Sequence, residues 1–457
     1  MCKPSEPANN IEKVFVREIG EHNGAKRVWI DSNRLEGTPF TAGTPITVFV
    51  KPNKITVMRG HVDSGEGTRL GISKVHSRRG KPVLDINNKE IEKNLPKIEK
   101  VTIIIRENEM EIIPLLKDQA LGGECTGVDL TSVGLFSGGG LLDKAFQRAG
   151  FNPVFAVEME EKYLETYEAN HPGVPTCRCD INDLDFRLLP KHPSIALIGF
   201  PCTRFTNLRM DLKRKRKENG EPDEGWDTVK LAFAALNALL FMEPEMIALE
   251  EVPPFAGTVS EELFLNTLMA HGYVSQYKTI IDGEDYGCLS QRRRYCLIAS
   301  KNPDFQIEIT PERVCAPMTI GDILEIPAAE REWHDETTNK TVKMLKNIEK
   351  GHIAKGRNFR MKAFTVDDTC VSALSGDYNR CRVSDPVLTD GAGRYSRFTE
   401  REVARLMGVP DDFELKGCRG VRYQVAGQGV QMDAWTSVAM QTRSAYERTR
   451  EDPLASA

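Results

Sequence analysis

The chain has 457 residues, 40% of them hydrophobic and 28% charged, which is enough to bury a full core and indicates two or three domains. A net charge of −5 argues, taken alone, against a nucleic-acid partner. The first twenty residues are polar and no apolar run approaches the roughly 20 residues that cross a bilayer, so we expect a cytoplasmic protein without a membrane partner.

Residues 1–120 contain short β-branched runs, such as 46–50 and 101–105, separated by turn-forming residues. Such runs predict strands. Two stretches, about 27–59 and 81–114, align without a gap: Val28 falls on Val83, and Ile46 on Val101, 55 positions later. An internal repeat usually means two copies of one small unit packed as a pair, so we predict a duplicated small β domain. DNA binding, a structural role and dimerisation all stay open for it.

From residue 128 onward the sequence pattern predicts alternating strands and helices. Apolar runs predict strands at "TSVGLF" (131–136), "VFAVE" (154–158), "SIALIGF" (194–200) and "MIALEEV" (246–252), and helical patterns lie between them at 141–150, 162–172 and 228–242. This alternation predicts an α/β fold with a doubly wound parallel sheet. We expect an α/β domain at 128–300, a polar Lys/Arg-rich insertion at 301–390, a return of the α/β domain at 391–445, where Thr399 and Glu402 predict a capping box, and a tail at 446–457.

Unusual residues follow several of these strands, and ligands of doubly wound sheets gather at the carboxyl ends of strands. Gly138 and Gly140 follow the first strand, where glycine lets the backbone turn sharply and approach a ligand. Glu158 ends the second strand and can accept hydrogen bonds from a ribose. Asp180 follows a short third run. Each of these residues also has an ordinary structural explanation, so only their occurrence together indicates a ligand site.

The run "IALIGF" is followed by Pro201 and Cys202, and then by a strongly basic stretch. A thiol is a soft nucleophile, and a partly exposed, electropositive setting favours its ionised form. Glu250 ends another predicted strand, and Arg292 and Arg294 alternate along a further one. A nucleophilic thiolate, a carboxyl group and forked donors suit an electron-poor ring that carries a carbonyl and a ring nitrogen.

In this order, the motifs resemble those of the C5-cytosine DNA methyltransferases over roughly 130–445. The resemblance is carried by "GLFSGGG" (134–140), "VEME" (157–160), "CDI" (179–181), "GFPC" (199–202), "EEV" (250–252), "SQRRRY" (290–295), "RFTEREVARLMGVPDDF" (397–413) and "GQGV" (427–430). Each motif is weak alone, but this many in order are highly specific. The fold then implied is a Rossmann-like methyltransferase sheet, with a small target-recognition domain at 301–390 and the mainly-β domain in front.

The resemblance implies methyl transfer from S-adenosylmethionine to C5 of cytosine in double-stranded DNA. Cys202 would attack C6 of a flipped-out base, Glu250 would engage N3 and the exocyclic amine, and Arg294 would contact the base carbonyl with Arg292 in support. The cofactor would lie against Phe136, Ser137, Gly138, Gly140, Glu158, Asp180, Ile181, Pro201, Gln428 and Val430. No metal is expected.

Two basic patches on this acidic chain suit the DNA partner. Seven Lys/Arg stand against one acidic residue in 204–217, and eight stand against one in 340–362. The DNA-binding residues that we expect are Arg204, Arg209, Lys213, Arg214, Lys215, Arg216 and Lys217, which would close over the DNA, and Lys355, Arg357 and Arg360. We expect a monomer on DNA, and a cognate restriction endonuclease stays open as a further partner.

Several positions depart from the family pattern: Gly134, Glu251, Ser290, and Gln428 with Gly429. Glu251 either faces Glu250, where repulsion would raise the pKa of one carboxyl group, or points away into a structural hydrogen bond, which alternation along a strand favours. The alternatives to the main hypothesis are a non-standard sulfonium donor, tRNA cytosine methylation, and an inactive DNA-binding regulator on the same scaffold.

Overall fold

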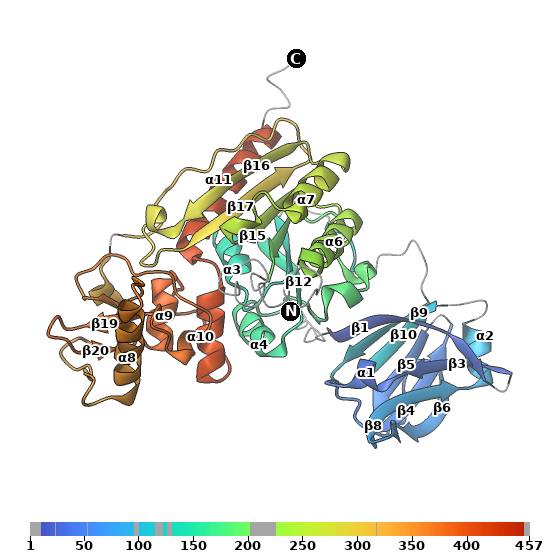
Figure 1. Cartoon of the computed structure of the whole chain (residues 1–457). Helices are drawn as coiled ribbons and strands as arrows, with labels where there is room; N and C mark the ends of the chain where they lie inside the picture. The colour runs from blue at the N-terminus through green and yellow to red at the C-terminus, as the bar shows by residue number, and fades with distance from the viewer. Residues whose placement is uncertain are drawn as a thin grey trace, which may run out of the picture. The chain divides into compact units, whose positions relative to one another are not determined.

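The computed structural model describes residues 11–22, 24–52, 54–95, 100–114, 122–125, 130–201, 225–316 and 318–451. The chain forms two compact units, drawn in Figure 1. The first contains the chain up to Glu124 together with 155–160 and 173–191, and the second contains 125–154, 161–172 and everything from His192 onward. Within the described ranges, no helix is both long and apolar enough to cross a membrane.

The first unit is rich in β structure. Its strands are β1 (Ile11–Glu18), β2 (Gly20–His22), β3 (Ala25–Ile30), β4 (Pro45–Lys51), β5 (Lys54–Arg59), β6 (Thr68–Lys74), β7 (His76–Arg78), β8 (Lys81–Asn87), β9 (Lys100–Arg106), β10 (Glu109–Pro114), β13 (Thr176–Arg178) and most of β12 (Asn152–Glu158). They follow the order β12-β13-β1-β9-β10-β5-β4-β6 in one sheet and β2-β3-β8-β7 in another. The short helices α1 (Ser32–Leu35) and α2 (Lys89–Asn94) are capped by the side chains of Asp31 and Asn88.

The strand register gives the two sequence copies a local two-fold relation. β5 and β10 pair antiparallel with Thr56 opposite Glu111, and these residues are 55 positions apart. β3 and β8 pair antiparallel with Trp29 opposite Asp85, which are 56 positions apart. Positions that oppose their own equivalents lie about a two-fold axis. An offset of 55 residues therefore relates β4 and β5 to β9 and β10, whereas an offset of 56 residues relates β3 to β8.

The repeat also reaches further back than 27 and 81. β1 of the first copy pairs antiparallel with β9 of the second, and β6 of the second pairs antiparallel with β4 of the first. β1 and β6, like β2 and β7, are thus equivalent, and each copy lends its first strand to the other. An irregularity in the β4–β6 register accounts for the extra residue. Both copies fill one core, in which Val28, Ile30, Ile103 and Ile105 are fully buried.

The second unit is an α/β sheet in the order β16-β17-β15-β14-β11. Its strands are β11 (Thr131–Leu135), β14 (Ile195–Gly199), β15 (Met246–Glu251), β16 (Ser275–Asp282) and β17 (Arg293–Ser300). Its helices are α3 (Leu141–Arg148), α4 (Glu161–Asn170), α6 (Gly225–Met242), α7 (Val259–Ala270), α8 (Lys340–Ala354), α9 (Glu400–Leu406), α10 (Arg419–Gln428) and α11 (Met432–Glu451).

The α/β fold is confirmed, but the sheet is mixed rather than all parallel. β11, β14 and β15 run parallel, as the alternating pattern predicts. β17 runs antiparallel to β15, and β16 antiparallel to β17. Because β17 runs back along β15, its first residues lie beside the last residues of β15. This reversal brings the arginine-rich start of one strand to the acidic end of another.

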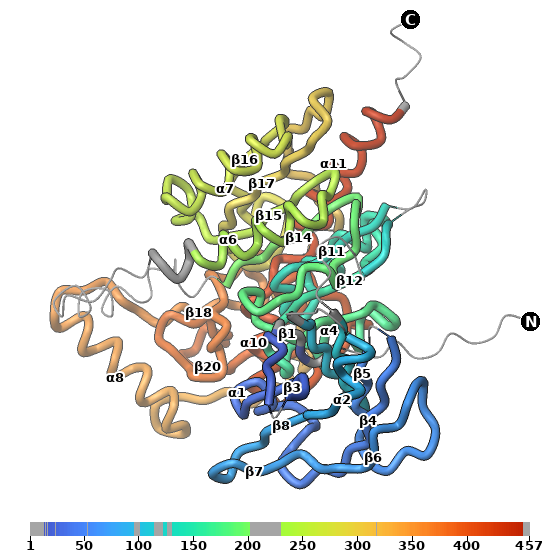
Figure 2. The backbone as a smooth tube through the Cα atoms, turned by 90° about the vertical axis from the view of Figure 1, so that its right-hand side faces the viewer, coloured from blue at the N-terminus to red at the C-terminus, as the bar shows by residue number. Residues whose placement is uncertain are grey.

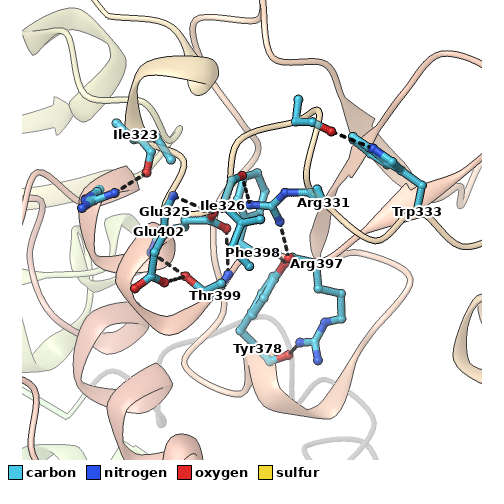
Figure 3. Close-up of polar contacts among 12 residues, drawn as sticks. Ile323, Glu325, Ile326, Arg331, Trp333, Tyr378, Arg397, Phe398, Thr399 and Glu402 are labelled. Atoms are coloured by element: carbon cyan, nitrogen blue, oxygen red, sulfur yellow. Dashed lines mark hydrogen bonds and ion pairs between the residues drawn. The ribbon is translucent and has the colours of Figure 1, made fainter.

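The segment between β17 and α9 forms the lobe that contains α8 and a small sheet of β18 (Lys362–Phe364), β19 (Pro386–Thr389) and β20 (Tyr395–Ser396), visible in orange and brown in Figures 1 and 2. Figure 3 shows how the chain before α8 is tied to α9: Glu402, within the predicted capping box with Thr399, pairs with Arg331. Both side chains of this ion pair are buried. That 301–390 is a separate target-recognition domain stays a prediction.

Candidate active site

The glycine-rich turn after β11 carries three residues in the left-handed region. Phe136 has φ 60°, Gly138 φ 55° and Gly140 φ 85°, and the backbone N–H of Gly140 donates to the carbonyl of Ser137 at 2.9 Å. A non-glycine residue at positive φ is strained, and such strain gathers at functional sites. The turn leads directly into α3, of which Gly140 is the N-cap.

The turn is tightly packed at Gly139 and Gly140 but not at Gly138. A Cβ at Gly140 would lie 2.7 Å from His171 Nε2, and one at Gly139 would lie 2.5 Å from a methyl group of Val425 on α10. A Cβ at Gly138 would meet nothing within 4 Å. The turn is therefore packed against α4 and α10 on one side and has open space at Gly138, where a ligand can approach.

Gly134 makes room for a buried carboxyl group that the sequence reading missed. A Cβ at Gly134 would lie 2.3 Å from Asp143 Oδ1, so a side chain there would collide with Asp143. Asp143 lies on α3, is almost fully buried, and accepts a hydrogen bond from the hydroxyl of Tyr167 at 3.2 Å. Burial raises the pKa of Asp143 to about 7, against the opposing effect of the Tyr167 bond. A charged residue within the apolar pattern of α3 was the signal that could have identified it.

Phe136, Gly199, Glu250 and Arg294 come together at the carboxyl ends of β11, β14 and β15. Gly199 lies beside Glu250 in the parallel register, and a Cβ at Gly199 would lie 3.8 Å from Glu250 Oε2 and 3.9 Å from the carbonyl oxygen of Phe136. Glu250 Oε1 lies 2.6 Å from Arg294 Nε, and only 11% and 13% of their side chains are exposed. A carboxylate and a guanidinium therefore meet at the edge where ligands of such sheets bind.

Glu251, the neighbour of Glu250, is fully buried. One carboxyl oxygen accepts a hydrogen bond from the backbone N–H of Val252, and the other has no hydrogen-bond partner among the described residues. Burial, and then the charge of Glu250, raises the pKa of Glu251 to about 8. This agrees with the expectation that Glu251 makes a structural hydrogen bond, and it places the raised pKa on Glu251.

Arg292 lies just before β17 and is buried against the C-terminal motif. Its guanidinium donates to the carbonyls of Gly427 at 2.8 Å, Gln428 at 2.9 Å and Leu374 at 3.3 Å. These bonds connect the end of α10 to the strand that carries Arg294. The geometry gives Arg292 a positioning role rather than direct contact with a reacting group.

The departures at Gln428, Gly429 and Ser290 are accommodated by local packing. The side chain of Gln428 packs on Gly376, where a Cβ would lie 2.4 Å from its Cγ, and a Cβ at Gly429 would lie 2.8 Å from Leu141. Ser290 is buried, and its hydroxyl lies 3.0 Å from the amide nitrogen of Gln431, which also donates to the Ser290 carbonyl. A glutamine from another motif thus fills the site beside the small serine, and sequence reading missed it. Val430 is buried in the same region.

In the first unit, two of the predicted cofactor residues end neighbouring parallel strands. Glu158 is the last residue of β12, lies opposite Arg178 of β13, and accepts the backbone N–H of Glu160 at 2.8 Å. Asp180 follows β13, and its carboxylate accepts the backbone and side-chain N–H groups of Asn182 at 2.9 and 2.8 Å. Ile181 is buried beside it. Both carboxylates thus lie at the carboxyl edge of these strands.

The remaining expected residues divide into two groups. Pro201 is exposed at the end of the described stretch, and Cys202 lies outside the described residues, as do Arg204, Arg209, Lys213, Arg214, Lys215, Arg216 and Lys217. Lys355, Arg357 and Arg360 lie exposed at the end of α8 and beyond it. Across the described ranges, no three His, Cys, Asp or Glu side chains are grouped so as to hold a metal ion.

Comparison with known proteins covers the same part of the chain. The profile of the family described as C-5 cytosine-specific DNA methylase matches residues 130–444. The Type II methyltransferase M.NlaX of Neisseria lactamica is 26% identical over 322 residues, which cover 68% of this chain and 96% of that protein. The Type II methyltransferase M.DsaV of Dactylococcopsis salina is 26% identical over 328 residues, covering 70% and 88%.

Solved structures share the fold. The methyltransferase EhMeth of Entamoeba histolytica superimposes with a TM-score of 0.54 at 16% identity, covering 70% of this chain and 99% of that one. The Dnmt2 methyltransferase of S. pombe gives 0.53 at 20% identity, covering 71% and 99%. The family profile spans well over half of the chain. The chain therefore belongs to the C-5 cytosine-specific DNA methylases and is a DNA (cytosine-5) methyltransferase with S-adenosylmethionine as methyl donor.

Proposed function

We propose that this enzyme methylates cytosine through a covalent bond between Cys202 and C6 of a base flipped out of double-stranded DNA. The observation that carries the proposal is the pairing of Glu250 Oε1 with Arg294 Nε at 2.6 Å, at the edge of the sheet where β14 also ends. Cys202 follows Pro201 directly, and consecutive Cα atoms are about 3.8 Å apart. The proposed nucleophile is therefore the next residue in the chain after the described stretch that follows β14.

Each side chain has a distinct task in this mechanism. The Cys202 thiolate forms a bond to C6, while Glu250, in its carboxylic acid form, gives a proton to N3, so that the electron pair displaced by the attack accumulates at C5. Arg294 contacts the base carbonyl. C5 then takes the methyl group and loses its proton to a base, the bond between sulfur and C6 breaks, and the proton on N3 returns to Glu250, which restores the ring, the thiolate and the carboxylic acid.

The ion pair suits this mechanism because both partners keep free capacity for a substrate. In the described structure, Arg294 also donates one hydrogen bond to the carbonyl of Arg293, at 2.8 Å. An entering base would compete for the guanidinium and leave Glu250 to engage N3 and the exocyclic amine. Arg292 supports this exchange by fixing the start of β17 through its bonds to Gly427 and Gln428.

The chain offers a fitting cradle for S-adenosylmethionine, which supplies an electrophilic methyl group when it is bound. The open space at Gly138, within a turn that is otherwise tightly packed, leaves room for this ligand. Glu158 would accept hydrogen bonds from ribose hydroxyls, and Asp180 with Ile181 would hold the adenine. The residues that we propose to complete the pocket are Phe136, Ser137, Gly140, Pro201, Gln428 and Val430.

The basic residues serve the DNA. We propose that those in 204–217 clamp phosphates around the flipped base, and that Lys355, Arg357 and Arg360 hold the backbone beside the bases that the 301–390 region reads. The Type II names of the relatives support a cognate restriction endonuclease as a partner. We also propose that the enzyme is cytoplasmic and acts as a monomer on DNA.

Trapping tests the covalent step. Duplex DNA that contains 5-fluorocytosine cannot release the enzyme, because fluorine at C5 cannot leave as a proton. Incubation with S-adenosylmethionine should therefore shift the wild-type protein to a DNA-linked band on a denaturing gel, whereas Cys202→Ser should give none. A Cys202→Ser protein that methylates unmodified DNA as fast as the wild type would disprove the proposal.

A further inference from the structure

The second copy of the β repeat begins with an exposed, basic ribbon. We call residues 68–81 the basic arm: it contains β6, Val75, β7, the turn at Arg79 and Gly80, and Lys81. β6 is the last strand of one sheet and β7 the last strand of the other. Apart from Leu70 and Val75, every residue of the arm is exposed. Figure 2 labels both strands of the arm.

The arm is strongly basic, and three of its five cations have no acidic partner among the described residues. It holds Arg69, Lys74, Arg78, Arg79 and Lys81 but no acidic residue. Arg69 and Lys81 reach Asp63 and Glu36 only at 3.7 Å, in exposed ion pairs. In the part of the chain that the structure describes, no side-chain hydrogen bond or ion pair holds Lys74, Arg78 or Arg79. These three cations are available to a partner.

The first copy shows that the fold does not require this charge. By the two-fold relation, with the offset of 56 that pairs Trp29 with Asp85, Lys74 corresponds to Glu18, and Arg78 corresponds to His22. The sequence at the equivalent of Arg79 has Asn23. One scaffold thus carries an acidic end in one copy and a basic end in the other, so the basic residues are not explained by folding.

Arg79 is also strained. Arg78 and Lys81 are paired across a two-residue turn, and the residues within it have φ 53° at Arg79 and φ 79° at Gly80. Turns of this kind favour Asn-Gly, because both central residues need positive φ. The first copy has that dipeptide in its sequence at Asn23 and Gly24. An arginine that persists where asparagine is easier points to a use for its side chain.

We propose that the basic arm docks on the phosphate backbone of duplex DNA, outside the region that performs methyl transfer. Duplex DNA carries a negative charge about every 1.7 Å, and an exposed ribbon of cations without acids matches this charge density. Such contacts bind without reading sequence. The inference rests on DNA as the enzyme's substrate and is independent of the covalent mechanism, because its test measures binding.

Titration of full-length protein with duplex DNA at a series of salt concentrations tests the arm. Arg78→Ser with Arg79→Asn should reduce the slope of log K against log salt by about 0.9 for each phosphate that the arm no longer neutralises, or up to about 1.8. At 0.1 M salt this is a loss of affinity on the order of 10- to 100-fold. Arg79→Asn alone should halve the effect and leave the melting temperature equal to or above that of the wild type, because asparagine suits the turn.

The matched control removes two lysines from α2 of the same copy. Lys89 and Lys93 are exposed, and Lys93 is held by Glu90, so Lys89→Ser with Lys93→Ser changes net charge equally without touching the arm. Its salt slope should equal that of the wild type. An unchanged slope in the arm variants, an equal loss in the control, or a loss confined to duplex RNA would each overturn the proposal.

Discussion

The second unit contains two buried arginine–carboxylate pairs with opposite characters. Arg331 and Glu402 join the lobe that contains α8 to α9, with 2% and 0% of their side chains exposed. Arg294 and Glu250 lie at the ends of β17 and β15, with 13% and 11% exposed. The chemistry of the partners is the same, so the difference in role comes from what surrounds them.

Among the described residues, the first pair makes many hydrogen bonds and leaves only Arg331 Nε without a partner, whereas the second pair makes few. Glu402 accepts, besides the Arg331 guanidinium, the backbone N–H groups of Glu325 and Thr399, both at 2.9 Å, and Arg331 donates to the Arg397 carbonyl at 2.9 Å (Figure 3). Glu250 has the Arg294 contact and a second oxygen beside Gly199. A pair with many hydrogen bonds to the backbone holds structure, whereas a pair with few can exchange partners with a substrate.

The largest expected effect is on catalysis at the Arg294–Glu250 pair. Glu250→Gln removes the proton donor for N3 while keeping the shape, so kcat should fall by about 10²- to 10⁴-fold. Because this pair makes few hydrogen bonds, the melting temperature should stay near that of the wild type. Single-turnover methylation of duplex DNA, with calorimetry on the same sample, measures both. Equal damage to stability and rate would mean that the two pairs are alike.

Breaking the Arg331–Glu402 pair should act on folding instead. Arg331→Met leaves Glu402 buried without its charged partner and should cost about 3–5 kcal/mol of unfolding free energy. The double variant Arg331→Met with Glu402→Met should recover part of this loss, since an apolar pair carries no desolvation penalty. Urea unfolding of the three proteins gives the comparison. A single variant as stable as the wild type would refute the structural role of the pair.

The sequence predicted the strands around the site, and the capping box at Thr399 and Glu402 is confirmed. These features depend on local patterns: apolar runs for buried strands, and a spacing of three residues for the box. Arg331 could not be assigned as the partner of Glu402, because the two residues are distant in sequence and only packing brings them together. The antiparallel direction of β17, which sets Arg294 against Glu250, was missed for the same reason.

The departures from the family pattern teach the same lesson. Ser290 and Gly134 were visible as unusual residues, but Gln431 and Asp143, which occupy the space beside them, were not identified. The sequence shows that a motif position carries an unusually small residue, whereas the side chain that fills the space beside it comes from another part of the fold. The equivalence of β1 with β6 was likewise hidden, since a one-residue irregularity shifts the repeat offset.

A smaller effect, on the pH dependence of stability, should distinguish Glu251 from Glu250. The pKa of Glu251 is raised to about 8, so between its ordinary value and pH 8 the folded protein holds a proton that the unfolded chain has released. Rising pH therefore favours unfolding across this window, by up to about 1.4 kcal/mol for each pH unit. Glu251→Gln should lose this dependence. The difference in unfolding free energy between variant and wild type should grow from pH 5 to pH 8, and a constant difference would contradict the assignment.

The smallest expected effect tests whether Asp143 stands in the space that Gly134 leaves. A Cβ at Gly134 would lie 2.2 Å from Ser137 Oγ and 2.3 Å from Asp143 Oδ1. Gly134→Asp should therefore destabilise the protein by about 1–3 kcal/mol. Asp143→Ala should relieve part of this cost in the double variant, although alone it removes the partner of the Tyr167 hydroxyl. If thermal unfolding shows simple additivity, the two positions do not compete for one space, because only neighbours that share a site are coupled.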